Sequence, residues 1–277
     1  AHSAAIVLGV FMLGLAAGGI YWGAFVQRAG APVRLLRHLF AAAAGFALFG
    51  VLPYFSLTPF VSQILAAQGS ISAWFLKLLF VAMVVLPTTF CMGGTLPVST
   101  WLLLSDKDIA RTGFGSLSFF NLLGSFLGAI FTTYYLIESL GYWGSFCSGV
   151  LIVLAAILPT IGIAERENVI VAAESQKIDK LKQLFKNPYS ASAFFAGFIL
   201  FALELIWYRL LTPLTGGSAY AMGAIFATVL LGMALGSEFA SFLDPERIRT
   251  RPLLPVVFLI MGSLLSISYW IGDNWAV

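Results

Sequence analysis

The sequence predicts an all-α fold whose helices cross a lipid bilayer several times. Of the 277 residues, 60% are hydrophobic and only 10% are charged, and several apolar runs are long enough to span a membrane. A soluble domain of this length needs far more charge on its surface, whereas a membrane-spanning helix needs about 20 apolar residues. The mean hydropathy of +0.96 agrees. We therefore expect a multi-pass membrane protein whose main partner is the bilayer, and no nucleic-acid partner.

Eight membrane spans are expected. They cover residues 4–26, 35–56, 73–103, 115–136, 142–163, 191–212, 219–241 and 252–271. Lysine and arginine residues follow the first, third, fifth and seventh spans, and the intervening connections contain none. Because positively charged loops stay on the cytoplasmic side, we expect the basic loops in the cytoplasm and residue 1 outside. The expected location is the plasma membrane, in particular a bacterial inner membrane.

The third span is longer than one bilayer crossing requires. As a straight helix, residues 73–104 would extend about 48 Å, against about 30 Å for the bilayer core. Its helix-perturbing residues are Pro87, Gly93, Gly94 and Pro97. The sequence therefore predicts a kink or break near CMGGTLP.

Irregular backbone within a membrane needs protein or water around it. We therefore expect residues 92–97, including Thr95, to line a polar cavity together with Asn121 of the next span. A proline kink that only improves packing is the alternative. Glycine pairs one turn apart are expected to let helices approach closely; they are Gly14/Gly18, Gly19/Gly23, Gly124/Gly128 and Gly232/Gly236.

Residues 164–190 are the only long polar segment, and they divide the chain. Apolar residues within this segment share one helical face and lysines cover much of the rest, which is typical of an amphipathic helix on the cytoplasmic leaflet. A solvated linker helix is the alternative. The predicted domains are a first transmembrane repeat (1–163), this linker, and the start of a second repeat (191–277).

An internal repeat supports this division. At a constant offset of 218, FMLGLAAGG at 11–19 aligns with VLLGMALGS at 229–237, in the same orientation. A parallel repeat predicts two sets of six spans, as in major-facilitator architecture. On this interpretation the chain lacks the first span of its first repeat and is the middle of a longer protein.

The stretch ELIWYRLLTPLTGGSAYA, residues 204–221, carries the main candidate site. Glu204 lies about 20 Å along its predicted span, and a carboxylate within a membrane should face the bundle interior. We expect an inward-facing polar cluster of Glu204, Ser218 and Tyr220 that opens to the outside and holds a small cationic amine. A structural hydrogen-bonded carboxylate is the alternative.

Two further candidates flank this carboxylate. Arg209 lies close enough to the outer surface to extend its charge into water. Trp207 is a candidate either for the polar cluster or for an aromatic anchor at the membrane interface. The cysteines Cys91 and Cys147 lie in separate apolar runs, so no metal site or disulfide is predicted and both are expected to be buried.

Three stretches resemble the membrane region of spermidine-synthase-like proteins. In that family an acidic residue, a tryptophan and an arginine share one span, and a Ser-x-Tyr-Ala turn and a glycine-rich span follow. The matching residues here are Glu204, Trp207, Arg209, Ser218, Tyr220 and Ala221. MGGTLP at 92–97 and ARTGFGSLSFFNLLGSFLGA at 110–129 resemble two more family segments, with Asn121 in the characteristic place.

The resemblance implies a transporter-like membrane region that anchors a cytoplasmic aminopropyltransferase domain and handles polyamine or a related amine. The chain has no glycine-rich loop followed by an acidic strand end. No catalytic residue or cofactor is therefore assigned to this segment, and aminopropyl transfer by the parent protein would occur elsewhere. The alternatives are a major-facilitator-type transporter and a structural subunit that binds protein partners in a larger membrane complex.

Overall fold

The computed structural model describes residues 2–66, 71–104, 113–163, 188–215 and 219–242, with short helical pieces between 256 and 270. Nearly all of the predicted linker 164–190 lies outside the described residues, as do Ser218 and much of the predicted last span.

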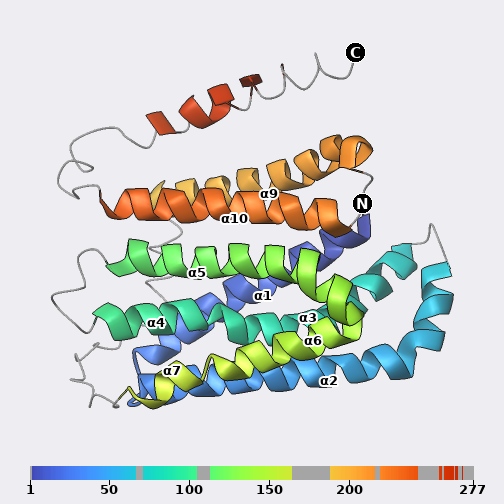
Figure 1. Ribbon diagram of the computed structural model, residues 1–277, viewed down its shortest axis with the longest axis horizontal. Coiled ribbons are helices and arrows are strands. Elements are labelled where there is room, and N and C mark those ends of the chain that lie inside the picture. The colour runs from blue at the N-terminus through green and yellow to red at the C-terminus, as the bar shows by residue number, and fades with distance from the viewer. Residues whose placement is uncertain are drawn as a thin grey trace.

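The described chain is a bundle of helices that lie alongside one another (Figure 1). They are α1 (His2–Val26), α2 (Pro32–Ala66), α3 (Ile71–Gly93), α4 (Thr95–Leu104), α5 (Gly113–Phe131), the π-helix η1 (Thr132–Leu136), α6 (Ile137–Ala155), α7 (Leu158–Ile161), α9 (Pro188–Thr215) and α10 (Ala219–Ser241). The predicted all-α class is confirmed.

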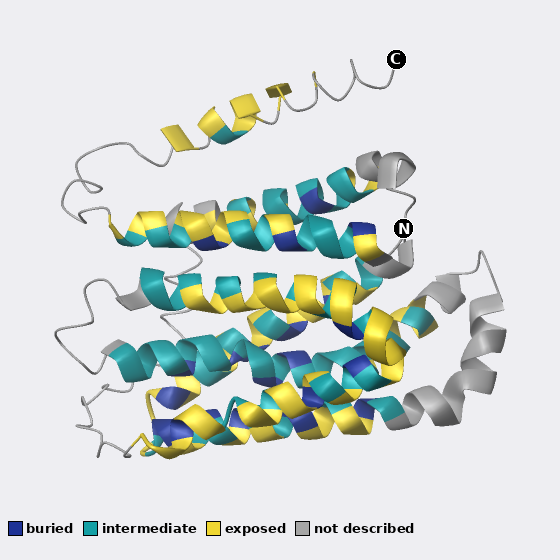
Figure 2. Cartoon of the chain, in the orientation of Figure 1, coloured by how far each residue is buried: buried dark blue, intermediate teal, exposed yellow. Residues whose placement is uncertain are grey.

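Five stretches are long and apolar enough to cross a membrane. They are Ala5–Val26, Pro32–Val51, Phe75–Leu103, Gly115–Ile161 and Tyr220–Ser241. Large apolar side chains such as Phe49, Phe120 and Phe198 are exposed on the outside of the bundle, and Figure 2 shows exposed residues along the outward sides of α5 and α6. A multi-pass protein in contact with lipid explains this inverted surface.

The stretch Gly115–Ile161 folds back on itself. Its 47 residues would extend about 70 Å as one straight helix, which is more than twice the bilayer core. The chain reverses at Gly141, whose φ of 66° and ψ of −177° are unusual for any residue except glycine. Figure 1 shows α5 and α6 running in opposite directions on either side of this reversal, which lies between the predicted fourth and fifth spans.

The predicted break in the third span is present. α3 ends at Gly93 and α4 begins at Thr95. Pro97 has no N–H to donate to the carbonyl of Gly93, four residues earlier. Local bonds replace the regular pattern: the Gly94 N–H donates to the Cys91 carbonyl at 3.1 Å, and the Thr95 hydroxyl donates to the Met92 carbonyl at 2.8 Å.

α1 and α3 pack with their backbones nearly touching. A Cβ atom at Gly18 would collide with the carbonyl of Phe90, and one at Gly93 would collide with the carbonyl of Leu15. At Gly14 the obstacle is the side chain of Thr89. The predicted packing role of Gly14 and Gly18 is therefore confirmed.

α5 and α10 form a second close, antiparallel pair. A Cβ atom at Gly115 would meet Ser241, and one at Gly223 would meet Thr133 of η1, which directly follows α5. Between these points α10 presents Ala227 and Ala234, which are 2% and 0% exposed. Small residues at this spacing form one face and let the two backbones approach.

The glycine pairs expected to pack elsewhere do not do so. Among the described residues, no atom lies within 4 Å of a Cβ built on any member of the pairs Gly124/Gly128 and Gly232/Gly236. The prediction was wrong for these pairs because α5 and α10 meet along a different face. Cys91 is buried as expected, whereas Cys147 is exposed.

An arginine fixes the end of the bundle where α2 begins. The guanidinium of Arg37 donates to the Thr160 hydroxyl at 3.2 Å, and also to the carbonyls of Thr160 and Ile161. These acceptors lie at the C-terminal end of α7, where backbone carbonyls lack helical partners and favour a positive charge. The contact joins segments more than 120 residues apart.

Candidate functional site

Glu204 is buried where three helices meet. Its side chain on α9 is 6% exposed. It lines a small cavity whose other residues are Leu8 of α1, Leu205 and Tyr208 of α9, and Met222, Ile225 and Phe226 of α10. The three residues of α10 lie at positions i, i+3 and i+4, so they form one face of that helix. Glu204 thus faces other helices, where an intramembrane acid is expected to point.

The cavity is apolar and small. Its volume is about 10 Å³, which is near the lower limit for one water molecule. In the part of the chain that the structure describes, no hydrogen bond or ion pair reaches the Glu204 carboxylate. This arrangement has no room for an organic ligand beside Glu204.

The cavity lies towards one end of the bundle. Met222 is only three residues into α10, and Leu8 is only six residues into α1, which correspond to about 5 Å and 9 Å of helix. Figure 1 shows that these two helices begin at the same end, opposite the end where α7 and the start of α2 meet. Glu204 and the hydrogen bonds from Arg37 to the end of α7 therefore lie in opposite halves of the bundle.

Tyr220 lies in a different group of side chains. It precedes Met222 by two residues on α10. This spacing places its side chain about 200° around the helix from Met222, which lines the cavity at Glu204. The Tyr134 hydroxyl donates to the Tyr220 carbonyl at 3.2 Å. The two aromatic rings are 5.8 Å apart, at an angle of 37°.

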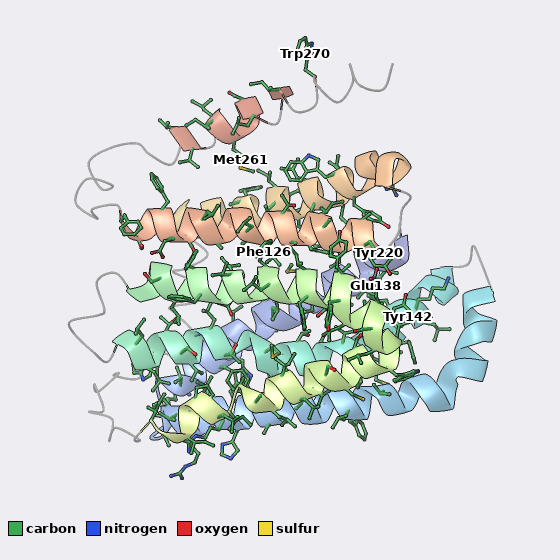
Figure 3. The ribbon with its side chains drawn as sticks, viewed as in Figure 1. Phe126, Glu138, Tyr142, Tyr220, Met261 and Trp270 are labelled. Carbon is green, nitrogen blue, oxygen red and sulfur yellow. The ribbon has the colours of Figure 1, made fainter. Side chains whose placement is uncertain are left out.

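A second carboxylate is the partner of this tyrosine. It is Glu138, in the first turn of α6. Figure 3 shows Glu138, Tyr142 and Tyr220 gathered at one end of the bundle. We call Tyr134, Glu138, Tyr142 and Tyr220 the tyrosine–glutamate cluster.

The local fold explains how this cluster is assembled. The π-helix η1 carries Tyr134, and Glu138 follows in the first turn of α6. The reversal at Gly141 then brings Tyr142 back towards them. α10 comes close enough to add Tyr220 because Gly223 leaves room for Thr133 of η1. Single-turn π-helices often occur at functional sites.

Sequence reasoning missed Glu138. It placed residues 137–141 in a short connection and searched only the spans for charges. The stretch TTYYLIESLGYW, residues 132–143, concentrates tyrosines around one acid, and this could have identified the cluster. Its link to Tyr220, 82 residues later, depends on the packing of α10 against η1.

The remaining candidates lie apart from Glu204. Trp207 is half-buried and Arg209 is exposed on α9, and neither lines the cavity. The Thr95 hydroxyl is bonded within its own helix break. Asn121 is exposed on α5, where its carbonyl accepts a hydrogen bond from Ser125 at 2.9 Å. Tyr220 joins Glu138 instead of Glu204.

Within the described ranges, no three His, Cys, Asp or Glu residues are grouped as a metal site requires. No protein-family model, curated protein or solved structure matches the chain.

Proposed function

We propose that the chain is the membrane-embedded region of a spermidine-synthase-like protein, which anchors a cytoplasmic domain and binds a cationic amine within the membrane. The observation that carries the proposal is the burial of Glu204 where α1, α9 and α10 meet. Keeping an acid among apolar side chains in a membrane costs free energy, so such residues commonly mark substrate or proton pathways. A carboxylate is also a strong hydrogen-bonding partner for a protonated amine.

Amine binding at Glu204 requires a second conformation. The cavity of about 10 Å³ is too small for an organic amine, so α9 and α10 must separate where they flank Glu204. α10 packs along much of α5 but contacts α9 less extensively. Because fewer contacts are lost, movement of α9 away from α10 is the less costly route.

For the topology we propose eight spans in a parallel repeat, with the basic loops in the cytoplasm of a bacterial cell. α1 and α10, the helices aligned by the internal repeat, run in the same direction through the bundle (Figure 1). Arg37 and the end of α7 lie at the opposite end from the cavity. On this topology the Glu204 cavity belongs to the outer half of the membrane.

The small cavity favours a second candidate function. A carboxylate enclosed by apolar groups, with room for at most one water, also suits a structural subunit in which Glu204 has only a packing role. The two candidates differ in whether Glu204 interacts with an external amine.

Amine uptake by a Glu204→Gln variant tests the proposal. This change keeps the side-chain size and removes the negative charge. We expect uptake of labelled spermidine into proteoliposomes to fall about tenfold or more, the usual scale for losing a charge-assisted hydrogen bond. Glu238→Gln, near the other end of α10, is the matched control and should retain uptake. Normal uptake by folded Glu204→Gln protein would reject amine binding at Glu204 and favour the structural subunit.

A further inference from the structure

The tyrosine–glutamate cluster has the composition of a cation site. A carboxylate and three aromatic rings from η1, α6 and α10 gather at one end of the bundle (Figure 3). The faces of aromatic rings attract cations within about 6 Å of the ring centre, and a carboxylate accepts hydrogen bonds from an ammonium group. From this arrangement we propose that Glu138, Tyr134, Tyr142 and Tyr220 form a surface binding site for a primary ammonium group.

The carboxylate of Glu138 can be reached from outside the bundle. It is exposed to the exterior of the bundle, so it does not carry the full cost of burying a charge. The side chain of Tyr220, in the first turn of α10, lies beside it (Figure 3).

The tyrosines remain available to a ligand. Tyr142 is 75% exposed, and Tyr134 uses its hydroxyl to bond the backbone of α10, so that its ring is fixed. The tilted pair of Tyr134 and Tyr220 therefore forms one wall of the proposed site, and the ring of Tyr142 is exposed beside it (Figure 3).

Two sources can supply a primary ammonium group at this location. One is a free amine in solution, and the other is the headgroup of phosphatidylethanolamine in the outer leaflet. Both present the same N–H donors to Glu138 and the same charge to the tyrosine rings. A quaternary ammonium such as tetramethylammonium keeps the charge but has no N–H to donate.

The site is separate from the one proposed at Glu204, and it rests on the proposed function only in the choice of amine probe. Tyr220 faces Glu138, whereas Met222 faces Glu204. Each carboxylate can therefore be substituted on its own.

The test measures binding of 1,4-diaminobutane to the full chain by isothermal titration calorimetry in lipid-free detergent. We expect Glu138→Gln to weaken binding about tenfold and Tyr142→Leu to weaken it about threefold. The controls are Glu238→Gln and Tyr135→Leu. Tyr135 lies on the same π-helix, is 60% exposed and stacks on Phe131 outside the cluster. Tetramethylammonium should bind more weakly than the diamine.

A second arm identifies the source of the ammonium group. The titration is repeated in phosphatidylcholine nanodiscs with and without phosphatidylethanolamine. Reduced diamine affinity in the presence of phosphatidylethanolamine assigns the site to the lipid headgroup, and unchanged affinity assigns it to the free amine. The proposal is overturned if wild-type protein binds neither source, or if Glu138→Gln binds like Glu238→Gln while circular dichroism shows both folded.

The outcomes also separate this site from the proposed function. Loss of binding in Glu138→Gln with normal uptake in Glu204→Gln would retain the surface site and reject the role of Glu204. Normal binding in Glu138→Gln with impaired uptake in Glu204→Gln would do the reverse.

Discussion

Replacing Gly18 by alanine should weaken the contact between α1 and α3. The added Cβ would collide with the carbonyl oxygen of Phe90 and lie 2.8 Å from its carbonyl carbon. These are backbone atoms of a helix, so they cannot rotate away as a side chain does. Overpacking of this kind costs about 1–3 kcal/mol, and the rigid obstacle places Gly18→Ala near the upper value.

Gly9→Ala is a matched control on the same helix. No atom lies within 4 Å of a Cβ at Gly9, so this variant gains the helix propensity of alanine, about 1 kcal/mol, without a collision. The same gain applies at Gly18, so the difference between the two variants isolates the collision. We expect a difference of about 3 kcal/mol, or roughly 100-fold in the folding equilibrium.

Gly14→Ala should fall between these two variants. The obstacles there are two atoms of the Thr89 side chain. Its hydroxyl can rotate at the cost of its hydrogen bonds to the Val85 and Leu86 carbonyls, whereas its Cβ, 2.8 Å away, requires a small shift of the helix. The free energy of unfolding is measured for all three variants by titration with sodium dodecyl sulfate from mild detergent micelles. Equal stability of the Gly18→Ala and Gly9→Ala proteins would refute the close packing of α1 on α3.

Three further perturbations test other parts of the bundle. Arg37→Ala should lower the free energy of unfolding by about 1–3 kcal/mol, because it removes charged hydrogen bonds to Thr160 and Ile161. His38→Ala is the neighbouring control, and equal stability of the two variants would argue that these hydrogen bonds do not stabilise the bundle. Gly141→Ala should cost about 1–3 kcal/mol because of the backbone conformation at the reversal, and an unchanged melting temperature would contradict that geometry. A cysteine replacing Gln68 should react with an impermeant maleimide in intact cells, since its connection contains no lysine or arginine, and protection until the cells are opened would reverse the proposed orientation.

Some features of this bundle follow from local sequence. The helical class follows from apolar runs, and the break at Gly94 follows from adjacent glycines and a proline that cannot continue the hydrogen-bond pattern. The extent of α2 does not follow in this way. Its predicted span ended at residue 56, whereas the helix continues to Ala66. The length of an apolar run predicts that a segment crosses the membrane, but it does not determine where the helix ends.

Features that need knowledge of the neighbouring helix could not be predicted. A glycine pair indicates a groove, but Gly14/Gly18 and Gly232/Gly236 look alike in sequence, and only the first pair receives a partner in the described structure. Likewise, the sequence places Tyr220 near Glu204 along the chain, whereas the twist of α10 turns it towards Glu138. Long-range packing decided which carboxylate became its neighbour.

The start of α10 separates two carboxylates by the thickness of a single helix. Tyr220 touches the group containing Glu138, and Met222, on the other side, closes the cavity at Glu204. A rotation or tilt that loosens one contact must move the other, because an intact helix turns as a rigid rod over so few residues. If both carboxylates bind ligands, their occupancies are thermodynamically coupled, and the coupling is reciprocal. A cation that fixes Tyr220 would change the affinity at Glu204, and a ligand at Glu204 would change the affinity at Glu138 by the same factor.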